Sequence, residues 1–402
     1  MVETVDKFGF IAEQLAQRRQ AHLLRTVQPF DPQGAVVGKR GDSLRHGSAN
    51  REIVNFSSND YLGLSKHPRL IAVAQDYMQR YGTSAAASRL VTGTYPIHQQ
   101  LEQQLAIALG VESGLLFSSG FQANSTILPA LVDSSSVVVC DRQIHNSMVQ
   151  GILASRARFI RYRHNDLAHL EQVLQTVSQR DYNRILIASE TVFSMDGDRT
   201  DVDALADLAH HYNAILYLDD AHALGVLGKD GLGLAAHHPG VDILIGTFGK
   251  AFGAFGAFVG CSQTVRDYLM NYCPGFIYTT ALPPAVIGAI SAALELIPIL
   301  EGDRQRLSQN AEQLRTGLHA IGGDTGTSSS QIVPLIIGDE AITLHLAHWL
   351  DQRGLLATAI RPPTVAKGTA RIRFALSSHH TPDQIDTLVH AIRDWQTHDT
   401  TN

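Results

Sequence analysis

The chain has 402 residues, of which 44% are hydrophobic and 17% are charged, and its formal net charge is −6. This composition is typical of a globular protein that buries a large core and divides into two or more lobes. Because the net charge is negative and no run of lysine and arginine occurs, we expect neither a nucleic acid nor an anionic membrane surface as the main partner.

Cysteine usage and hydropathy narrow the class of protein further. Cys140, Cys261 and Cys273 are widely spaced and form no CxxC pair, so we predict neither a disulfide framework nor a zinc site. Residues 1–20 mix charged with apolar side chains, and no stretch of about 18 apolar residues occurs. We therefore expect a cytoplasmic protein without a signal peptide or a membrane span.

The N-terminal part is expected to hold one helix and two short strands. Apolar residues recur at helical spacing between residues 6 and 25, and the pattern ends before Pro29. On spacing alone, Arg25 at the end of this helix is a solvated surface residue, with a substrate contact as the alternative. Strand-like stretches follow around residues 35–37 and 52–56.

Strands alternate with helices in the middle of the chain. A helix is predicted over residues 97–109, stopped by Gly110. The predicted strands are residues 114–117, 137–140, 158–162, 184–189, 214–218, 243–246 and 257–260. Continuous apolar strands separated by helices indicate an α/β fold with a mostly parallel sheet covered on both faces. Ligands of such sheets bind at the carboxyl ends of the strands.

The pattern changes beyond about residue 282. Two longer helices are predicted, followed by strands at residues 332–337, 355–360 and 371–376 and a last helix over residues 382–395. This order indicates a smaller α+β domain. We divide the chain into an N-terminal helix with short strands (1–50), a large domain (51–285) and a C-terminal small domain (286–402).

One lysine stands apart from the others. The chain has six lysines. Lys250 directly follows a buried strand and is flanked by glycines, whereas the remaining five lie in turn-like or polar stretches: Lys7, Lys39, Lys66, Lys229 and Lys367. A lysine shielded by apolar neighbours loses its proton readily and can attack a carbonyl as a free amine. The sequence therefore indicates Schiff-base chemistry at Lys250.

Acidic residues end the strand that precedes the lysine strand. Asp219 and Asp220 lie on opposite faces of that strand, so only one of them can face a given ligand. Alone, the pair could equally cap the next turn. Together with Lys250, an aspartate for a ring nitrogen and a lysine for an aldehyde form the minimal constellation for pyridoxal phosphate.

The phosphate of such a cofactor needs hydrogen-bond donors. Ser119, Gly120 and Phe121 open a helix at the end of a strand and offer backbone N–H groups and a hydroxyl. Thr247, Thr279 and Thr280 could supply further hydroxyls. His145 follows another strand end and could stack on the ring, although a histidine at a helix start is the simpler interpretation.

Other patterns carry less weight. Residues 231–236 match a GxGxxA dinucleotide string, but no strand leads directly into it. Three pairs of adjacent histidines diverge and are too closely spaced for a metal site, so we predict no metal.

The motifs taken together resemble the α-oxoamine synthases, which are pyridoxal-phosphate enzymes of fold type I, the aspartate-aminotransferase fold. The resemblance extends over nearly the whole chain. It rests on residues 55–64, 88–93, 118–121, 192–198, 219–222, 247–250 and 361–365. It implies a large domain with a mostly parallel seven-stranded sheet and a smaller α+β C-terminal domain.

The resemblance also implies the roles of the residues around the cofactor ring. Lys250 would form the covalent bond to the cofactor, Asp219 would pair with the pyridine nitrogen, and His145 would stack on the ring. His222 and Ser194 would approach its phenolic oxygen. Lys250, His145, Asp219 and His222 are thus the expected catalytic residues.

A homodimer is implied as well, with each active site at the subunit interface. Thr247 and the backbone of Gly120 and Phe121 would hold the phosphate, joined by Thr279 and Thr280 from the other subunit.

Four residues are assigned to substrates by the same resemblance. Arg373 would bind the carboxylate of the amino acid, with Arg371 on the same strand face as its competitor. Arg25 and Arg361 would lie near a second carboxylate on the acyl substrate, and Asn59 is the fourth.

The nearest branch of the family acts in biotin biosynthesis. It implies decarboxylative condensation of L-alanine with pimeloyl-CoA or pimeloyl-acyl-carrier protein. The alternatives are the branches that use glycine or serine, such as glycine C-acetyltransferase and serine palmitoyltransferase. A non-catalytic module that binds pyridoxal phosphate and a nucleotide-binding α/β protein are more distant alternatives.

Overall fold

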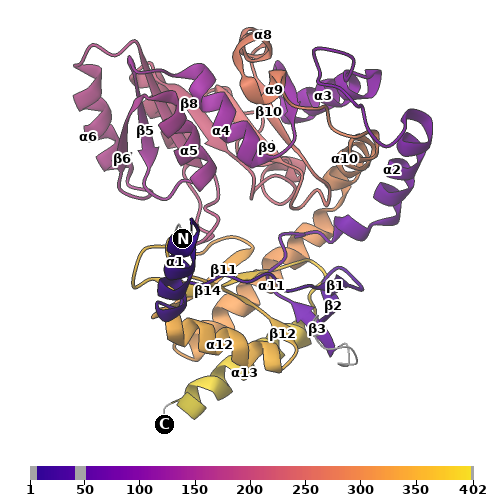
Figure 1. Ribbon diagram of the computed structural model, residues 1–402, viewed down its shortest axis with the longest axis vertical. Helices are drawn as coiled ribbons and strands as arrows, with labels where there is room; N and C mark the ends of the chain where they lie inside the picture. Colours follow the sequence, from indigo (N-terminus) through magenta and orange to yellow (C-terminus); the bar gives the residue numbers. More distant parts are fainter. Residues whose placement is uncertain (1–6, 41–50, 400–402) are drawn as a thin grey trace, which may run out of the picture.

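The computed structural model describes residues 7–40 and 51–399, and a seven-stranded sheet lies in the upper part of the molecule in Figure 1. The strand order is β4 (Ser113–Phe117), β10 (Ala257–Cys261), β9 (Ile243–Thr247), β8 (Ile215–Asp219), β7 (Arg184–Glu190), β5 (Ser136–Asp141) and β6 (Arg158–Tyr162). β10 is antiparallel to both of its neighbours, and the other pairs are parallel. These are the seven strands predicted from the sequence, and the mostly parallel sheet is confirmed.

Alternate side chains along each central strand enter two separate cores, because successive residues of a strand point to opposite faces. In β8, Leu216 and Leu218 join one core and Tyr217 joins the other. The first core is covered by α3 (Pro96–Leu109), α6 (Leu167–Ser178), α7 (Val202–His211) and α10 (Pro284–Leu296). The second is covered by α4 (Gly120–Leu131), α5 (Asn146–Ser155), α8 (Gln263–Tyr272) and α9 (Pro274–Ile277). The sheet is therefore buried on both faces.

Two smaller sheets form the lower part of the molecule in Figure 1. One has the order β11 (Ile332–Gly338), β14 (Ala370–Ala375) and β13 (Thr358–Ile360). The other has the order β1 (Asp31–Pro32), β2 (Val37–Arg40), β3 (Arg51–Asn55) and β12 (Leu355–Leu356). The helices α11 (Glu301–Ala320), α12 (Glu340–Gln352) and α13 (Pro382–Asp399) pack here. The single strand predicted over residues 355–360 is thus wrong, because β12 and β13 belong to different sheets.

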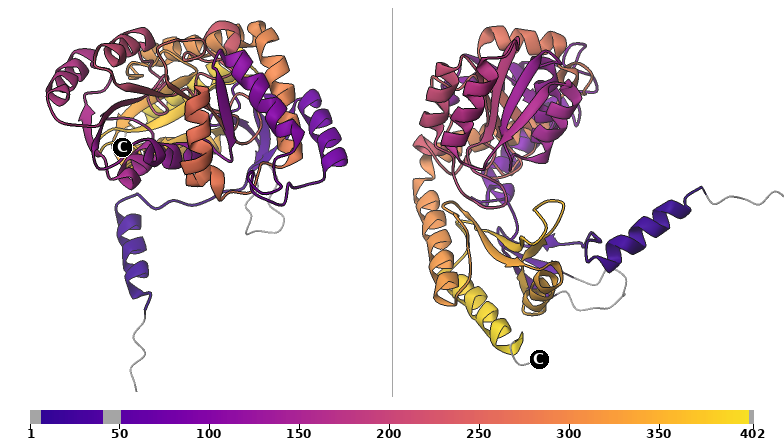
Figure 2. Two further views of the ribbon diagram at one scale, coloured as in Figure 1. Left: turned by 90° about the horizontal axis from the view of Figure 1, so that it is seen from above. Right: turned by 90° about the vertical axis from the view of Figure 1, so that its left-hand side faces the viewer.

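The N-terminal segment differs from the prediction in three ways. The first helix, α1 (Gly9–Gln20), is shorter than expected, buries no side chain and projects from the body (Figure 2). Lys39 lies in β2 rather than in a turn. β3 pairs with β12, so residues 51–55 join the small sheet rather than the large domain. Parts of the predicted N-terminal unit, residues 1–6 and 41–50, lie outside the described residues, and the remaining domain division stays a prediction.

The remaining helical segments of the described chain are one α-helix and three short 3-10 turns. They are α2 (Pro68–Tyr81) and the short turns η1 (Leu64–Lys66), η2 (Lys229–Gly231) and η3 (Ile297–Ile299). Within residues 7–40 and 51–399, no single helix is long and apolar enough to cross a membrane. In the same described residues, one pair of helical segments, Pro284–Ile299 and Glu301–Ala320, is together long and apolar enough for a membrane span, but the pair is bent by 78° at its junction.

Candidate active site

A cavity of about 310 Å³ opens at the carboxyl ends of the parallel strands, where the small domain faces the large sheet. It is lined by Ser57, Asn59, His145, Ser194, Met195, His222, Lys250, Thr358, Ile360 and Arg373. Six of these were predicted as site residues from the sequence. The fold therefore brings together side chains that lie more than 300 positions apart in the chain.

Lys250 follows β9 after a short turn and is half-buried. Beside it, the rings of Phe248 and Phe252 pack 5.1 Å apart and are fully buried. Burial lowers the pKa of the Lys250 amine to about 8, although the charges of Asp219 and Glu190 oppose this shift. A substantial fraction of this amine is therefore unprotonated and nucleophilic at mildly alkaline pH.

Asp219 ends β8 and is held in place by hydrogen bonds. Its Oδ2 accepts from Asn124 Nδ2 at 2.7 Å, and its Oδ1 accepts from the backbone N–H of Ala221 at 3.0 Å. Tyr217 in turn donates its hydroxyl to Asn124 Oδ1 at 2.7 Å. Asp219 is close enough to Lys250 for each charge to affect the other, which is the arrangement that the sequence predicted.

Asp220 points to the other face of the strand, as its position predicts. Its carboxylate accepts from the Thr191 hydroxyl and from the backbone N–H groups of Leu234 and Ala235. Burial raises its pKa to about 7. Asp220 therefore fixes a neighbouring loop rather than a ligand in the cavity.

Two histidines approach the cavity as neutral rings. His222 shares a hydrogen bond of 2.7 Å between its Nδ1 and the hydroxyl of Tyr61. His145 caps the first turn of α5, and its Nδ1 lies 2.7 Å from the hydroxyl of Ser147. Burial lowers the pKa of both imidazoles. Neutral rings can stack on an aromatic ligand or share a hydrogen bond with it without adding charge.

The start of α4 provides a cradle for an anion. Ser119 caps this helix by accepting from the backbone N–H of Gln122 at 3.1 Å. A side-chain carbon added at Gly120 would lie 3.7 Å from Cβ of Thr247, so the predicted hydroxyl lies beside the predicted helix start. Phe121, the third residue predicted here, is 51% exposed. Helix N-termini bind phosphate through free N–H groups and the helix dipole.

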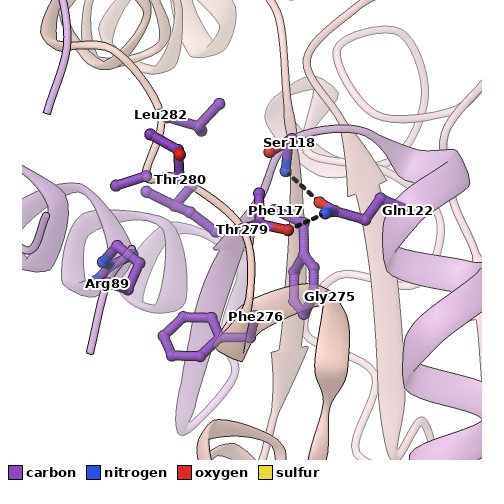
Figure 3. A pocket seen from close by; sticks show the side chains of 11 residues that line it. Arg89, Phe117, Ser118, Gln122, Gly275, Phe276, Thr279, Thr280 and Leu282 are labelled. Carbon is purple, nitrogen blue, oxygen red and sulfur yellow. Dashed lines mark hydrogen bonds between the residues drawn. The ribbon is translucent and has the colours of Figure 1, made fainter. Parts of the chain in front are cut away.

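Thr279 and Thr280 line a separate, smaller hollow (Figure 3). The side chain of Gln122 bridges it, because Oε1 accepts from Ser118 N at 2.9 Å and Nε2 donates to Thr279 Oγ1 at 2.6 Å. Thr280 forms an isolated β-bridge with Ser88. The two threonines thus lie beside the start of α4 and not in the cavity of Lys250.

Arg373 and Arg371, the two candidates for the amino-acid carboxylate, differ in their contacts. Arg373 lines the cavity, donates from Nε to the Ser194 carbonyl at 2.5 Å and donates from Nη2 to Asn59 Oδ1 at 3.1 Å. Arg371 forms an ion pair with Asp196 instead. Arg373 is therefore the guanidinium that is available to a ligand.

Arg25 and Arg361 lie close to each other next to the cavity, although neither lines it. Arg25 donates to Thr364 Oγ1 at 2.9 Å, and Arg361 donates to the His22 carbonyl. Burial lowers the pKa of Arg361, and so does the charge of Arg25. Ile360, the neighbour of Arg361, does line the cavity.

Sequence reasoning missed several buried groups that contact the predicted ones. Glu190 ends β7 in register with Asp219 on β8, and burial raises its pKa. Its Oε1 is buried and has no partner within the described residues. Asn124 and Tyr61, which hold Asp219 and His222, were not predicted to do so. The parallel register would have revealed Glu190, but the other two contacts depend on how helices and loops pack.

The residues present fit pyridoxal phosphate. The amine of Lys250 and the neutral imidazole of His145 line the cavity. The Asp219 carboxylate lies close enough to act on both groups, and the N-terminus of α4 lies beside Thr247, three residues before the lysine. These are the groups that the aldehyde, ring face, ring nitrogen and phosphate require. Among residues 7–40 and 51–399, no group of three or more histidine, cysteine, aspartate or glutamate side chains could hold a metal ion.

Fold and site together define a pyridoxal-phosphate-dependent transferase of the aminotransferase fold. The aminotransferase class I and II family model matches residues 51–392. The chain is 49% identical to the 8-amino-7-oxononanoate synthase of Gluconacetobacter diazotrophicus over 93% of each protein. It is 43% identical to that of Geobacter sulfurreducens over 95% of this chain and 96% of the relative. The chain belongs to the aminotransferase class I and II family and, within it, to the 8-amino-7-oxononanoate synthases.

Solved structures agree with this assignment. The structure of 8-amino-7-oxononanoate synthase from Francisella tularensis superposes with a TM-score of 0.75 at 29% identity, covering 87% of this chain and 99% of that one. Serine palmitoyltransferase from S. paucimobilis with a bound PLP–myriocin aldimine superposes with a TM-score of 0.87 at 25% identity, covering 98% of each chain.

Proposed function

We propose that this chain condenses L-alanine with a pimeloyl thioester and releases carbon dioxide, the free thiol and 8-amino-7-oxononanoate for biotin biosynthesis. The observation that carries the proposal is the cavity itself, in which Lys250 and Arg373 face each other, with the pair of Arg25 and Arg361 nearby. One cation can hold the carboxylate of the amino acid, and the pair can hold the distal carboxylate of a pimeloyl chain.

Pyridoxal phosphate is the cofactor, and when bound it supplies an aldehyde for the amino group and a ring that accepts the electrons left at the α-carbon. We assign its aldehyde to Lys250, its ring nitrogen to Asp219 and its ring face to His145. Asn124 donates to Asp219 Oδ2 and so fixes the direction of the carboxylate that we assign to the ring nitrogen.

Arg373 is well placed to orient the amino acid. Its Nε and Nη2 are fixed by the Ser194 carbonyl and by Asn59, and its remaining N–H groups can bind a carboxylate. A carboxylate held there fixes the direction of the Cα–H bond of alanine. Lys250 Nζ, with its lowered pKa, is the group that we assign to removing that proton.

His222, together with Ser194, is assigned to the phenolic oxygen of the cofactor. The hydrogen bond from Tyr61 fixes the orientation of the His222 ring, because this hydroxyl is buried and lies 2.7 Å from Nδ1. The carbonyl of His222 also accepts from Gln331 Nε2 at 2.7 Å. The ring is therefore held at Nδ1 and the backbone of the same residue is held at its carbonyl, before any ligand binds.

A second, cationic subsite suits the acyl chain. The Arg361 Nε is buried and has no partner within the described residues. The nearby charge of Arg25 makes the pair electrostatically unfavourable without an anion. A carboxylate at the end of the acyl chain would relieve this repulsion, which favours a pimeloyl over a purely aliphatic acyl group. The donor thioester can be that of coenzyme A or of an acyl-carrier protein.

We also propose a homodimer that completes the phosphate site, in a reducing compartment such as the cytoplasm. Large apolar side chains are exposed around the start of α4 and the threonine segment, among them Phe121, Tyr278 at 83% and Val91 at 75% exposure. Exposed apolar groups gathered in this way are typical of a protein interface. Cys140, Cys261 and Cys273 are free thiols, which fits reducing conditions.

Product identification tests the proposal. The holoenzyme should convert L-alanine and pimeloyl thioester to 8-amino-7-oxononanoate, identified by mass, and should turn over glycine and serine with acetyl or palmitoyl thioesters at least about a hundredfold more slowly. A preference for glycine or serine in this panel would assign the chain to another branch of the α-oxoamine synthases.

A further inference from the structure

The segment from Thr191 to Thr200 belongs to the large domain, lines part of the cavity and contacts the small domain. It leaves β7 as a narrow loop, closed by a bridge between Val192 and Arg199 and by a hydrogen bond of 3.0 Å from Phe193 N to the Asp198 carbonyl. At its tip, Ser194 and Met195 enter the cavity. The position of this loop therefore sets the shape of the amino-acid site.

The tip of the loop holds the arginines of β14. The Ser194 carbonyl accepts from Arg373 Nε at 2.5 Å, and Asp196 forms an ion pair with Arg371. The Gly197 carbonyl also accepts from Ser329 N of the small domain at 3.0 Å. Any shift of the loop tip would therefore reorient the guanidinium that we assign to the substrate carboxylate.

The base of the loop is anchored by a histidine between two carboxylates. His164 Nδ1 lies 3.0 Å from Asp141 Oδ1 at the end of β5, and His164 Nε2 lies 2.8 Å from Asp198 Oδ2 on the loop. Both aspartates are buried, and the edge of the His164 ring meets Phe193 with 4.4 Å between ring centroids. Because a carboxylate only accepts, both ring nitrogens must carry hydrogen, which makes this imidazole a cation.

We propose that His164 is a positioning residue, an imidazolium that joins Asp141 of the large sheet to Asp198 of the loop and thereby fixes the Arg373 guanidinium for the carboxylate of the amino acid. The inference rests on the proposed function in one respect, the role of Arg373.

The charges around His164 explain why the loop depends on it. Asp198 has one buried oxygen, Oδ1, without a partner within the described residues, and its other oxygen relies on His164 and on Asn165 Nδ2 at 2.6 Å. Burial would lower the pKa of His164, but the hydrogen bonds and charges of Asp141 and Asp198 outweigh it and raise this pKa to about 9. Without the cation, two buried carboxylates would face each other and would push the loop away from β5.

The test compares two amines that bind the holoenzyme, L-alanine and ethylamine, through the change that each causes in the visible spectrum. Ethylamine lacks the carboxylate, so it does not use Arg373. With His164→Gln we expect the dissociation constant of L-alanine to rise about tenfold, since one charge-assisted carboxylate contact is misplaced, and that of ethylamine to stay within about twofold. The KM for the pimeloyl thioester should also stay within about twofold.

Two control variants complete the experiment. His169→Gln alters a histidine of the same region, whose Nδ1 accepts from the backbone N–H of Arg163 at 2.9 Å. It should change the dissociation constant of neither amine. Arg373→Lys should weaken the binding of L-alanine but not that of ethylamine. If Arg373→Lys weakens neither, the proposed role of Arg373 fails, and with it the basis of this inference.

The proposal for His164 itself is overturned if Arg373→Lys behaves as expected and His164→Gln either leaves L-alanine binding unchanged or weakens both amines equally. If the His164→Gln variant fails to fold, Asp198→Asn is used instead. It removes the charge of the carboxylate that pairs with His164 and keeps the shape of the side chain. It is expected to weaken L-alanine selectively as well, and equal weakening of both amines would count against the proposal.

Discussion

Lys250 shows how a residue prepared for chemistry can cost stability. Its amine is removed from water in the cavity, and this burial lowers its pKa to about 8. In the unfolded chain the amine keeps an ordinary pKa near 10.4. Between these two values the unfolded state binds a proton that the folded state lacks, so the free energy of unfolding rises with pH in this window. Below pH 8 the full penalty for burying the charged lysine remains.

Replacing this lysine should therefore stabilise the cofactor-free protein. We expect Lys250→Met to raise the free energy of unfolding at pH 7 by about 1–3 kcal/mol, because it removes a partly buried charge. The gain should shrink as the pH rises from about 8 to about 10.4. Urea unfolding at several pH values measures it. Lys229→Met, at an exposed position, is the control and should shift the value by less than about 0.5 kcal/mol. No gain in Lys250→Met at pH 7 would contradict the account of this residue.

The elements of the large domain could be predicted well, because their signals are local. Each strand of the large sheet is a run of apolar residues, and β6 was predicted over the same residues, 158–162, that the structure assigns to it. The order of the strands and the antiparallel direction of β10 could not be predicted, because pairing is decided by contacts between distant segments.

The strands and helices of the smaller domain were harder to predict from the sequence. The run over residues 355–360 looks like one strand, but Thr358 N donates to Ser57 Oγ at 2.9 Å, and the chain changes sheets near this point. The helix α12 was missed although Asp339 caps it by accepting from the backbone N–H groups of Ala341 and Ile342. That local signal was available in the sequence.

The candidate site also contains residues that local sequence signals predict and residues that only the packing of distant segments reveals. Lys250, Asp219 and His145 could be found because each follows a strand end, where ligands of a parallel sheet bind. Asn124 and Glu190 contact these groups only through packing of α4 and pairing of β7 with β8. His164 lies in a connecting segment, and only the folded chain reveals the two carboxylates around it.

At the scale of the whole molecule, the proposed dimer makes each active site depend on two chains. Thr279 and Thr280 lie outside the cavity of Lys250 in their own subunit. If they complete the phosphate site of the partner, defects on different chains should complement each other.

Mixed dimers test this dependence. One chain carries Lys250→Ala and the other carries Thr279→Ala with Thr280→Ala, and each variant alone should have low activity at limiting pyridoxal phosphate. In the mixed dimer one site combines an intact Lys250 with intact threonines from the partner, so we expect up to about half of the normal activity per mixed dimer. No recovery, with mixed dimers verified by two affinity tags, would show that the threonines act within their own subunit.

The central claim is that Lys250 is the amine that binds the cofactor covalently. Reduction of the holoenzyme with borohydride makes this bond permanent, and mass mapping of the digested chain then locates the pyridoxyl group. We predict that it is found on the peptide containing Lys250. Its presence on any of the other five lysines, with Lys250 unmodified, would contradict the account.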